Sequence, residues 1–501
     1  MAASDQVRSL PYISIQPSLP LVIADIARPG SSIAVEDCWV SCYRRAKGVS
    51  GEEEGSVHGK MRVAEGEKDG QVEVESMDKQ VEVEMINEST FCVACPSLSV
   101  PPTPVLLPSP SLNSPQASSS TSSITQEIPA PSLYTLSARG GIDCATLSSD
   151  GRRLVVGGRD GQVRVVEIVR FEDGQAGAAG AKGKRLAKGK ETALRGHVGD
   201  LTAVAFFPSN EVVLTASSDM SLRIFSAIDG SSPRQLRAHT KRVTGAHILT
   251  SSDGAHKGRE ILSSSLDGTL KLWDVSKGEV TRTWTLSQPV SSLFVFSDAE
   301  SGAAGAEEPS VLIGKYALAG HSNGTISLVS LDLSTVSSTS AGPVLTLQTF
   351  TSSSLDTLVY EPSTRLVAAG GRSGTISLFR LPSLEQATAT EVQPLVEWRR
   401  TEGSSINCVR FSLHPRTFSA SSSQRSPSTA CSLLVAPSDG LAYRASLDSW
   451  AANAEVDVKV EEEFAGLDCE PATSIWDDAE GRVWVAGGGR DGSVRVYERE
   501  A

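Results

Sequence analysis

Two pairs of histidine and aspartate residues are of the types that proton-transfer chemistry needs. His197 is followed by Asp219, and His239 is followed by Asp267. An imidazole held beside a carboxylate is a common general acid–base arrangement. The same residue types also form buried networks that only hold a fold together, and the recurrence of the pair along the chain accounts for its spacing. We therefore interpret both pairs as structural, and expect no enzyme activity, no catalytic residue and no cofactor.

Two cysteine pairs raise the alternative of a metal site. Cys38 and Cys42 are separated by three residues, and Cys92 and Cys95 by two residues. The second spacing is typical of zinc ligands, but the only histidine near these pairs is His58. Small apolar side chains in a run such as FCVACP also pack well in a core. We favour packing and predict no metal ligand.

A hairpin signal dominates the rest of the chain. Residues 261–274 read ILSSSLDGTLKLWD, in which a turn at Asp267-Gly268 separates two runs with strand character. One hairpin cannot bury its own faces, so the stretch predicts further copies of itself. Six copies share the strand, turn and strand pattern: GGRDGQVRVV from Gly157, SSDMSLRIF from Ser217, HSNGTISLV from His321, GRSGTISLF from Gly371, PSDGLAYRA from Pro437 and GRDGSVRVY from Gly489.

These copies recur at the interval of a WD repeat with insertions, since one such blade takes about 40–45 residues. We therefore predict an all-β fold, a seven-bladed WD-repeat β-propeller preceded by a small, mainly β amino-terminal domain. In this repeat a histidine, a serine or threonine, the turn aspartate and a tryptophan hydrogen-bond in series. The residues assigned to the network are His197, Asp219, His239, Ser263, Ser265, Asp267, Trp273, Asp160 and Asp491.

Composition shifts suggest the domain boundaries. We predict an amino-terminal domain at 1–96, partly disordered, a Ser/Pro-rich linker at 97–131, and the propeller at 132–501. The last hairpin lacks a fourth strand, so residues 132–138 should close the ring beside it. Within the first domain, the alternating Val/Glu runs at 72–75 and 81–84 fit either a hairpin or a solvated acidic segment.

Composition also limits the partners. The 501 residues include 46 basic and 59 acidic ones, a formal charge of −13, so a basic protein surface is a better partner than nucleic acid. The eight scattered cysteines indicate a reducing compartment. We found no apolar run long enough for a membrane span and no signal peptide. We expect a cytoplasmic protein that is also nuclear if the basic segment Lys182–Lys190 is an import signal instead of a solvated loop.

Acidic residues gather near the loop before the last hairpin. Because loops between blades and turns within hairpins emerge on one face of a propeller, Asp200 should share that face. We predict that this set is an acidic docking surface for a basic partner, the alternative being a loop kept polar for solubility. The predicted partner-binding residues are Asp200, Glu461, Glu462, Glu463, Asp468 and Glu470.

Several segments together resemble one family, the proteasomal ATPase-associated factor, a WD-repeat assembly chaperone of the proteasome regulatory particle. They are residues 194–272, CWVSC from Cys38, GSVHG from Gly55, the stretch 86–96, GLDCEP from Gly466 and GRDG from Gly489. The resemblance implies a monomeric chaperone whose propeller binds the carboxyl-terminal domain of one ATPase subunit of the regulatory particle base. The repeat alone would equally fit another interaction scaffold, such as a ribosome-biogenesis or ubiquitin-ligase adaptor.

Overall fold

The computed structural model describes most of the chain, in segments that are dominated by strands. The described segments are residues 7–27, 31–48, 51–66, 72–87, 89–108, 134–135, 141–171, 185–250, 258–297, 312, 314–332, 343–384, 391–413, 431–448, 456–467, 470–489 and 492–498. Their helical elements are α1 (Leu19–Ile26) and the short 3-10 helices η2 (Pro96–Leu98) and η3 (Arg159–Gly161).

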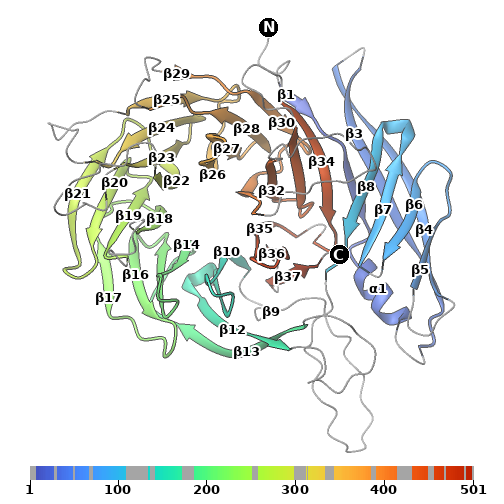
Figure 1. Cartoon of the computed structure of the whole chain (residues 1–501), viewed down its shortest axis with the longest axis horizontal. Helices are drawn as coiled ribbons and strands as arrows, with labels where there is room; N and C mark the ends of the chain where they lie inside the picture. Colours follow the sequence, from blue (N-terminus) through green and yellow to red (C-terminus); the bar gives the residue numbers. More distant parts are fainter. Residues whose placement is uncertain are drawn as a thin grey trace, which may run out of the picture.

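Mostly antiparallel sheets form a ring in which one edge strand of each sheet lies nearest the centre (Figure 1). Three of them are β10 (Ile142–Leu147), β11 (Arg153–Gly158), β12 (Val163–Phe171) and β13 (Arg185–Leu194); β14 (Leu201–Phe206), β15 (Val212–Ser217), β16 (Ser221–Ser226) and β17 (Arg234–Arg237); and β18 (Val243–Leu249), β19 (Glu260–Ser265), β20 (Thr269–Asp274) and β21 (Glu279–Thr285).

Three more sheets of the ring each include a strand from elsewhere in the chain. They are β22 (Val290–Ser297), β23 (Lys315–His321), β24 (Thr325–Ser330) and β25 (Leu345–Gln348) with β29 (Glu391–Val392); β26 (Leu355–Glu361), β27 (Leu366–Gly371), β28 (Thr375–Arg380) and β30 (Val396–Arg399) with β1 (Val7–Ser9); and β35 (Ala472–Asp477), β36 (Val483–Gly487) and β37 (Ser493–Tyr497) with β9 (Tyr134–Thr135). The inner strands contact one another in succession, and β35 contacts β10, which closes the ring.

The remaining part of the ring overturns the predicted fold class. Four strands, β31 (Ile406–Phe411), β32 (Cys431–Pro437), β33 (Tyr443–Asp448) and β34 (Asp457–Phe464), do not form a separate blade. They belong to an eleven-stranded sheet that continues into the amino-terminal strands. Six sheets of four or five strands are therefore the separate blades, and the prediction of seven blades was wrong. The cause is a parallel pairing of β8 with β34, which local sequence patterns do not reveal.

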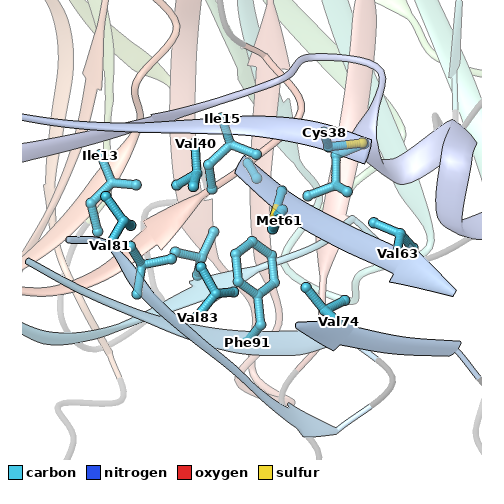
Figure 2. Close-up of a cluster of buried hydrophobic side chains, with 14 of the residues drawn as sticks. Ile13, Ile15, Cys38, Val40, Met61, Val63, Val74, Val81, Val83 and Phe91 are labelled. Carbon is cyan, nitrogen blue, oxygen red and sulfur yellow. The ribbon is translucent and has the colours of Figure 1, made fainter. Parts of the chain in front are cut away.

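Within this sheet, the amino-terminal strands curl around a core of their own beside the ring (Figure 1). They are β2 (Tyr12–Ile15), β3 (Val35–Gly48), β4 (Gly51–Glu65), β5 (Val72–Ser76), β6 (Glu82–Asn87), β7 (Thr90–Cys95) and β8 (Val100–Leu106). Figure 2 shows side chains such as Val40, Met61 and Phe91 meeting between the strands. Val74 and Val83 of the two Val/Glu runs join this core, so the runs are strands with one buried side and one exposed side.

The predicted linker overlaps this domain. Residues 100–106 form β8, which pairs with β7 on one side and β34 on the other, so the domain extends beyond the predicted boundary at 96. Residues 109–131 of the predicted linker lie outside the described residues. Tyr134 and Thr135 pair with Val494 and Ser493 of β37. The strand β9 thus lies beside the last hairpin.

Apolar residues at alternate strand positions bury the contact between neighbouring blades. Leu214, Leu222 and Leu236 of one blade meet Ile261 and Trp273 of the next, and all five are buried. Each blade is therefore stabilised by its neighbours more than by its own four strands. This arrangement gives a rigid frame for the turns and loops at the ends of the strands.

His247 on the inner strand β18 makes the frame sensitive to acid. Its ring lies 6.3 Å from that of Phe294, and burial together with the charges of Lys315 and Arg410 lowers its pKa to about 4. An unfolded histidine has a pKa of about 6.5, so between these values the unfolded chain binds more protons than the folded one. Stability should therefore fall as the pH decreases through this window.

We expect His247→Gln to reduce this loss by about 2 kcal/mol when urea unfolding at pH 7 is compared with that at pH 4.5. The other buried histidines contribute equally to both proteins, so the difference between them isolates residue 247. Identical pH profiles of the variant and the wild type would contradict the assignment.

Candidate protein-docking face

One face of the ring carries the hairpin turns together with the loops that lead into the inner strands, and we call it the turn face. Its glycines pack directly on these loops. A Cβ atom at Gly161 would lie 2.1 Å from the carbonyl oxygen of His197, and one at Gly440 would lie 2.2 Å from that of Leu467. The turns therefore pack tightly against the loops, and side chains on this face project from a rigid surface.

In the blade β18–β21 a histidine network fixes the turn. The Nδ1 atom of His239 lies 3.0 Å from Oδ2 of Asp267, and its Nε2 atom lies 2.7 Å from the hydroxyl of Ser263. The indole of Trp273 donates to the same hydroxyl at 2.8 Å. Ser265 completes the turn by accepting from the Asp267 amide at 3.1 Å and donating to the carbonyl of Lys241 at 3.0 Å.

The blade β14–β17 repeats this network with two replacements. His197 bonds Asp219 at 2.8 Å, but its Nε2 atom meets Thr215 at 2.7 Å, a residue that the sequence analysis did not assign. Phe225 replaces the tryptophan and lies 6.2 Å from the imidazole ring. Of the other residues assigned to the network, Asp491 and the side chain of Asp160 lie outside what the structure describes.

The electrostatics of these networks favour a fixed protonation state. Burial lowers the pKa of both His197 and His239, although the neighbouring aspartates oppose the shift. Burial would raise the pKa of Asp267, but hydrogen bonds from Thr269, the Thr240 amide and His239 lower it to about 2. A neutral imidazole beside a permanent carboxylate is suited to holding a turn, since every polar atom of the pair is already engaged.

Two further blades contain networks of related chemistry that sequence reasoning missed. His321 at the end of β23 bonds the hydroxyl of Ser327 at 2.8 Å and the carbonyl of Pro289 at 3.1 Å. In the next blade the hydroxyl of Ser377 donates at 2.7 Å to Glu397, which is buried. The sequence did contain a signal for these networks. Ser327 and Ser377 each occupy the third position of the third strand of their blade.

Removing the shared hydroxyl should measure how much one network stabilises the fold. We expect Ser263→Ala to lower the free energy of unfolding by about 1–3 kcal/mol, because His239 and Trp273 both lose a buried partner. Urea unfolding followed by tryptophan fluorescence would measure the change. Ser276→Ala removes an exposed hydroxyl bonded to Asp274 in the same blade and is the matched control. Equal effects of the two substitutions would contradict the role given to Ser263.

Two of the residues predicted for the acidic docking surface are buried in the structure. Glu462 and Glu463 lie in the strand β34 and are buried, paired with Arg444 and Arg400 respectively. They are not available to a partner, because both carboxylates are engaged inside the sheet. Glu461 is half-buried and accepts from the hydroxyl of Ser432 at 3.0 Å.

The other predicted acids are dispersed. Asp200 is exposed at the start of β14, and its carbonyl accepts from the Ser218 amide at 2.9 Å on the turn face. Glu470 is half-buried, with its carboxyl group close to Gly489. Asp468 lies outside the described residues. Of the five predicted acids that the structure describes, Asp200 alone is exposed.

The repeat itself is matched independently of the structure. The profile of the family described as "WD domain, G-beta repeat" matches residues 130–167, 189–226 and 230–274, and the last two segments contain the two complete histidine networks. These three segments of the chain therefore carry WD repeats.

Known proteins with different names are similar to parts of this chain. The 26S proteasome regulatory subunit RPN14 of Saccharomyces cerevisiae is 30% identical over 142 residues, covering 26% of this chain and 33% of the relative. The apoptotic protease-activating factor 1 of Danio rerio is 27% identical over 139 residues, 28% of this chain and 9% of the relative. The pre-mRNA-processing factor 19 of Bos taurus is 37% identical over 87 residues, 17% of this chain and 16% of the relative.

These matches span a third or less of each relative. They support the presence of the repeat, and the partners of this chain have to be inferred separately. One fold can host many unrelated functions, so the function has to be argued from the site.

Three of the four cysteines in the two pairs are part of the amino-terminal packing, and Cys92 is half-buried. Cys38, Cys42 and Cys95 are buried in the amino-terminal core, and burial, followed by the proximity of Cys95, raises the pKa of Cys42 to about 12. Within the described segments there is no group of three or more His, Cys, Asp or Glu side chains placed to hold a metal ion. None of the helices in those segments is long and apolar enough to cross a membrane.

Proposed function

We propose that this WD-repeat protein is an assembly chaperone of the proteasome regulatory particle, and that its ring binds the carboxyl-terminal domain of one proteasomal ATPase subunit. The observation that carries the proposal is the similarity to RPN14, whose name places that relative in the 26S proteasome. The resemblance of the segments near residues 38–42, 86–96 and 466–471 to the proteasomal ATPase-associated factor supports it from outside the three matched repeats.

The physical character of the ring suits this role. The histidine networks are saturated by hydrogen bonds within the fold, and the turn face is built on locked loops. A rigid surface binds with little loss of conformational entropy, and a wide disc seated on an ATPase subunit would exclude competing partners by its bulk alone. On this proposal the protein acts as a monomer in the cytoplasm and the nucleus.

A second candidate is a scaffold in another nuclear assembly. The match to pre-mRNA-processing factor 19 has the higher identity, 37%, although it covers only 87 residues. That match lies in a short stretch where the shared repeat can account for the identity, so we place it second.

Affinity capture from cell extract separates the two candidates. The full chain is immobilised and incubated with extract at low salt, and the bound proteins are identified by mass spectrometry. We expect free proteasomal ATPase subunits to be enriched over intact proteasomes. Enrichment of pre-mRNA-processing proteins without ATPase subunits, or capture of intact proteasomes alone, would reject the proposal. The same chain after heat denaturation is the control for nonspecific binding.

A further inference from the structure

One hairpin turn on the turn face departs from all the others. At the turn position with positive φ, six hairpins have glycine: Gly161, Gly268, Gly324, Gly374, Gly440 and Gly492. The blade β14–β17 has Met220 there, with a φ of 66°. An L-residue with a side chain is strained in this conformation, and glycine is not. The side chain of Met220 is also 44% exposed, so burial in the core does not offset the strain.

A second exposed apolar residue lies against this turn. Val198 is 84% exposed, and its amide donates to Oδ2 of Asp219, the residue before Met220, at 3.2 Å. Gly199 packs on the same turn, since a Cβ atom there would lie 3.0 Å from the Asp219 amide nitrogen. The buried carboxylate of Asp219 also bonds His197. Val198 and Met220 are therefore presented together by one rigid network.

Basic side chains are exposed on this blade and the next, although the chain as a whole is acidic. Arg195, Arg237, Lys241 and Arg242 are exposed on the loops and strand ends of this blade and the next. The guanidinium of Arg223 lies over Gly196, 2.8 Å from where a Cβ atom would be. Asp200 is the exposed carboxylate nearest in sequence to Val198. The surroundings therefore favour a partner that carries negative charge.

We propose that Val198 and Met220, with the exposed Arg195 and Lys241 on loops of the same face, form the docking site through which the ring holds its partner. The site would take an apolar side chain flanked by carboxylates on the carboxyl-terminal domain of the ATPase subunit. The identity of that partner rests on the proposed function. A strained residue that is exposed and fixed in place is best explained by a contact made outside the chain. Scattered single apolar residues need no such explanation, but this pair is held together.

The residue types make a test that separates binding from folding. Met220→Gly removes the side chain and relieves the turn, so it should leave the melting temperature unchanged or raise it. Val198→Ser removes the second apolar group from a position that is almost fully exposed. Ile228 is 50% exposed in the connection between β16 and β17 of the same blade, and Ile228→Ser is the matched control.

The probe is the purified carboxyl-terminal domain of whichever ATPase subunit the wild-type chain captures, and binding is measured by calorimetry. We expect the double variant Met220→Gly/Val198→Ser to bind at least tenfold more weakly and the control variant to bind normally. Arg195→Glu with Lys241→Glu should weaken binding most at low salt, because exposed charges are screened as the salt concentration rises.

The outcomes distinguish this inference from the function on which it rests. If the wild-type chain captures no ATPase subunit, the proposed function fails, and with it the partner named here. If the wild type binds and the double variant binds within twofold of it, the docking site is wrong while the function stands. A lower melting temperature for Met220→Gly would show that the methionine serves the fold, and would also overturn the site. Stronger binding by the charge-reversed variant would refute the requirement for carboxylates on the partner.

Discussion

Replacing Arg444 with methionine should lower the free energy of unfolding by about 3–5 kcal/mol, because it leaves a buried carboxylate without its cation. The side chains of Arg444 and Glu462 are both 0% exposed, and the guanidinium Nε donates to Oε2 of the carboxylate at 3.1 Å. Arg444 also donates to the hydroxyl of Ser412, which in turn donates to Asp477 at 2.6 Å. Loss of the arginine therefore disturbs an inner strand of the neighbouring blade as well.

Equilibrium unfolding in urea would measure this effect, and a second variant tests its cause. The double substitution Arg444→Met/Glu462→Leu removes both charges, and it should recover most of the lost stability because no uncompensated charge remains. Arg372→Met is the matched control, since Arg372 forms an exposed ion pair with Asp356 and should contribute less than about 1 kcal/mol. A double variant as unstable as the single one would show that packing, and not the buried charge, accounts for the loss.

Arg400→Met should destabilise the protein by a similar amount, about 3–5 kcal/mol, and should in addition loosen the amino-terminal domain. Arg400 is buried and pairs with Glu463 of β34. Its guanidinium carbon also lies 4.2 Å from the ring centroid of Tyr443 and 5.7 Å from that of Tyr12, which belongs to the amino-terminal strand β2. One side chain therefore connects the ring with the amino-terminal domain.

Hydrogen exchange resolved along the chain would detect the loosening. We expect faster exchange in β2 and in the β8–β34 pairing of the variant, with the blade β14–β17 unchanged. Uniform acceleration across all blades would indicate a general loss of stability, and unchanged exchange at β2 would refute the connecting role. Arg372→Met serves again as the control, because its ion pair lies on an exposed part of the ring.

The sequence predicts the repeated hairpins well because their signal is local. A turn residue with positive φ between two short alternating runs requires only about ten neighbouring residues to be recognised. The segments 189–226 and 230–274 were assigned to blades on this basis, and the match to the WD-repeat family confirms the repeat there. Asp267 and Trp273 could be assigned within the hairpin for the same reason.

The sequence could not predict features that depend on distant residues. The pairing of β8 with β34 joins segments from opposite parts of the chain, so the eleven-stranded sheet was missed. The acids Glu462 and Glu463 were assigned to the surface because they lie near the loop before the last hairpin. Their burial depends on Arg444 across the strand pair and on Arg400 from another sheet. Met220 was visible in the sequence as a departure from glycine, but its exposure beside Val198 required the structure.

The three long-range strand pairs have a consequence for how the protein is made. The strands β1, β8 and β9 are synthesised early, and each pairs with a strand that emerges much later: β30, β34 and β37. Until those partners leave the ribosome, the early strands have open edges that can pair with other chains. Pairings between distant residues also form slowly. Newly made chains should therefore be prone to aggregation until the ring closes, and slower translation would lengthen that interval.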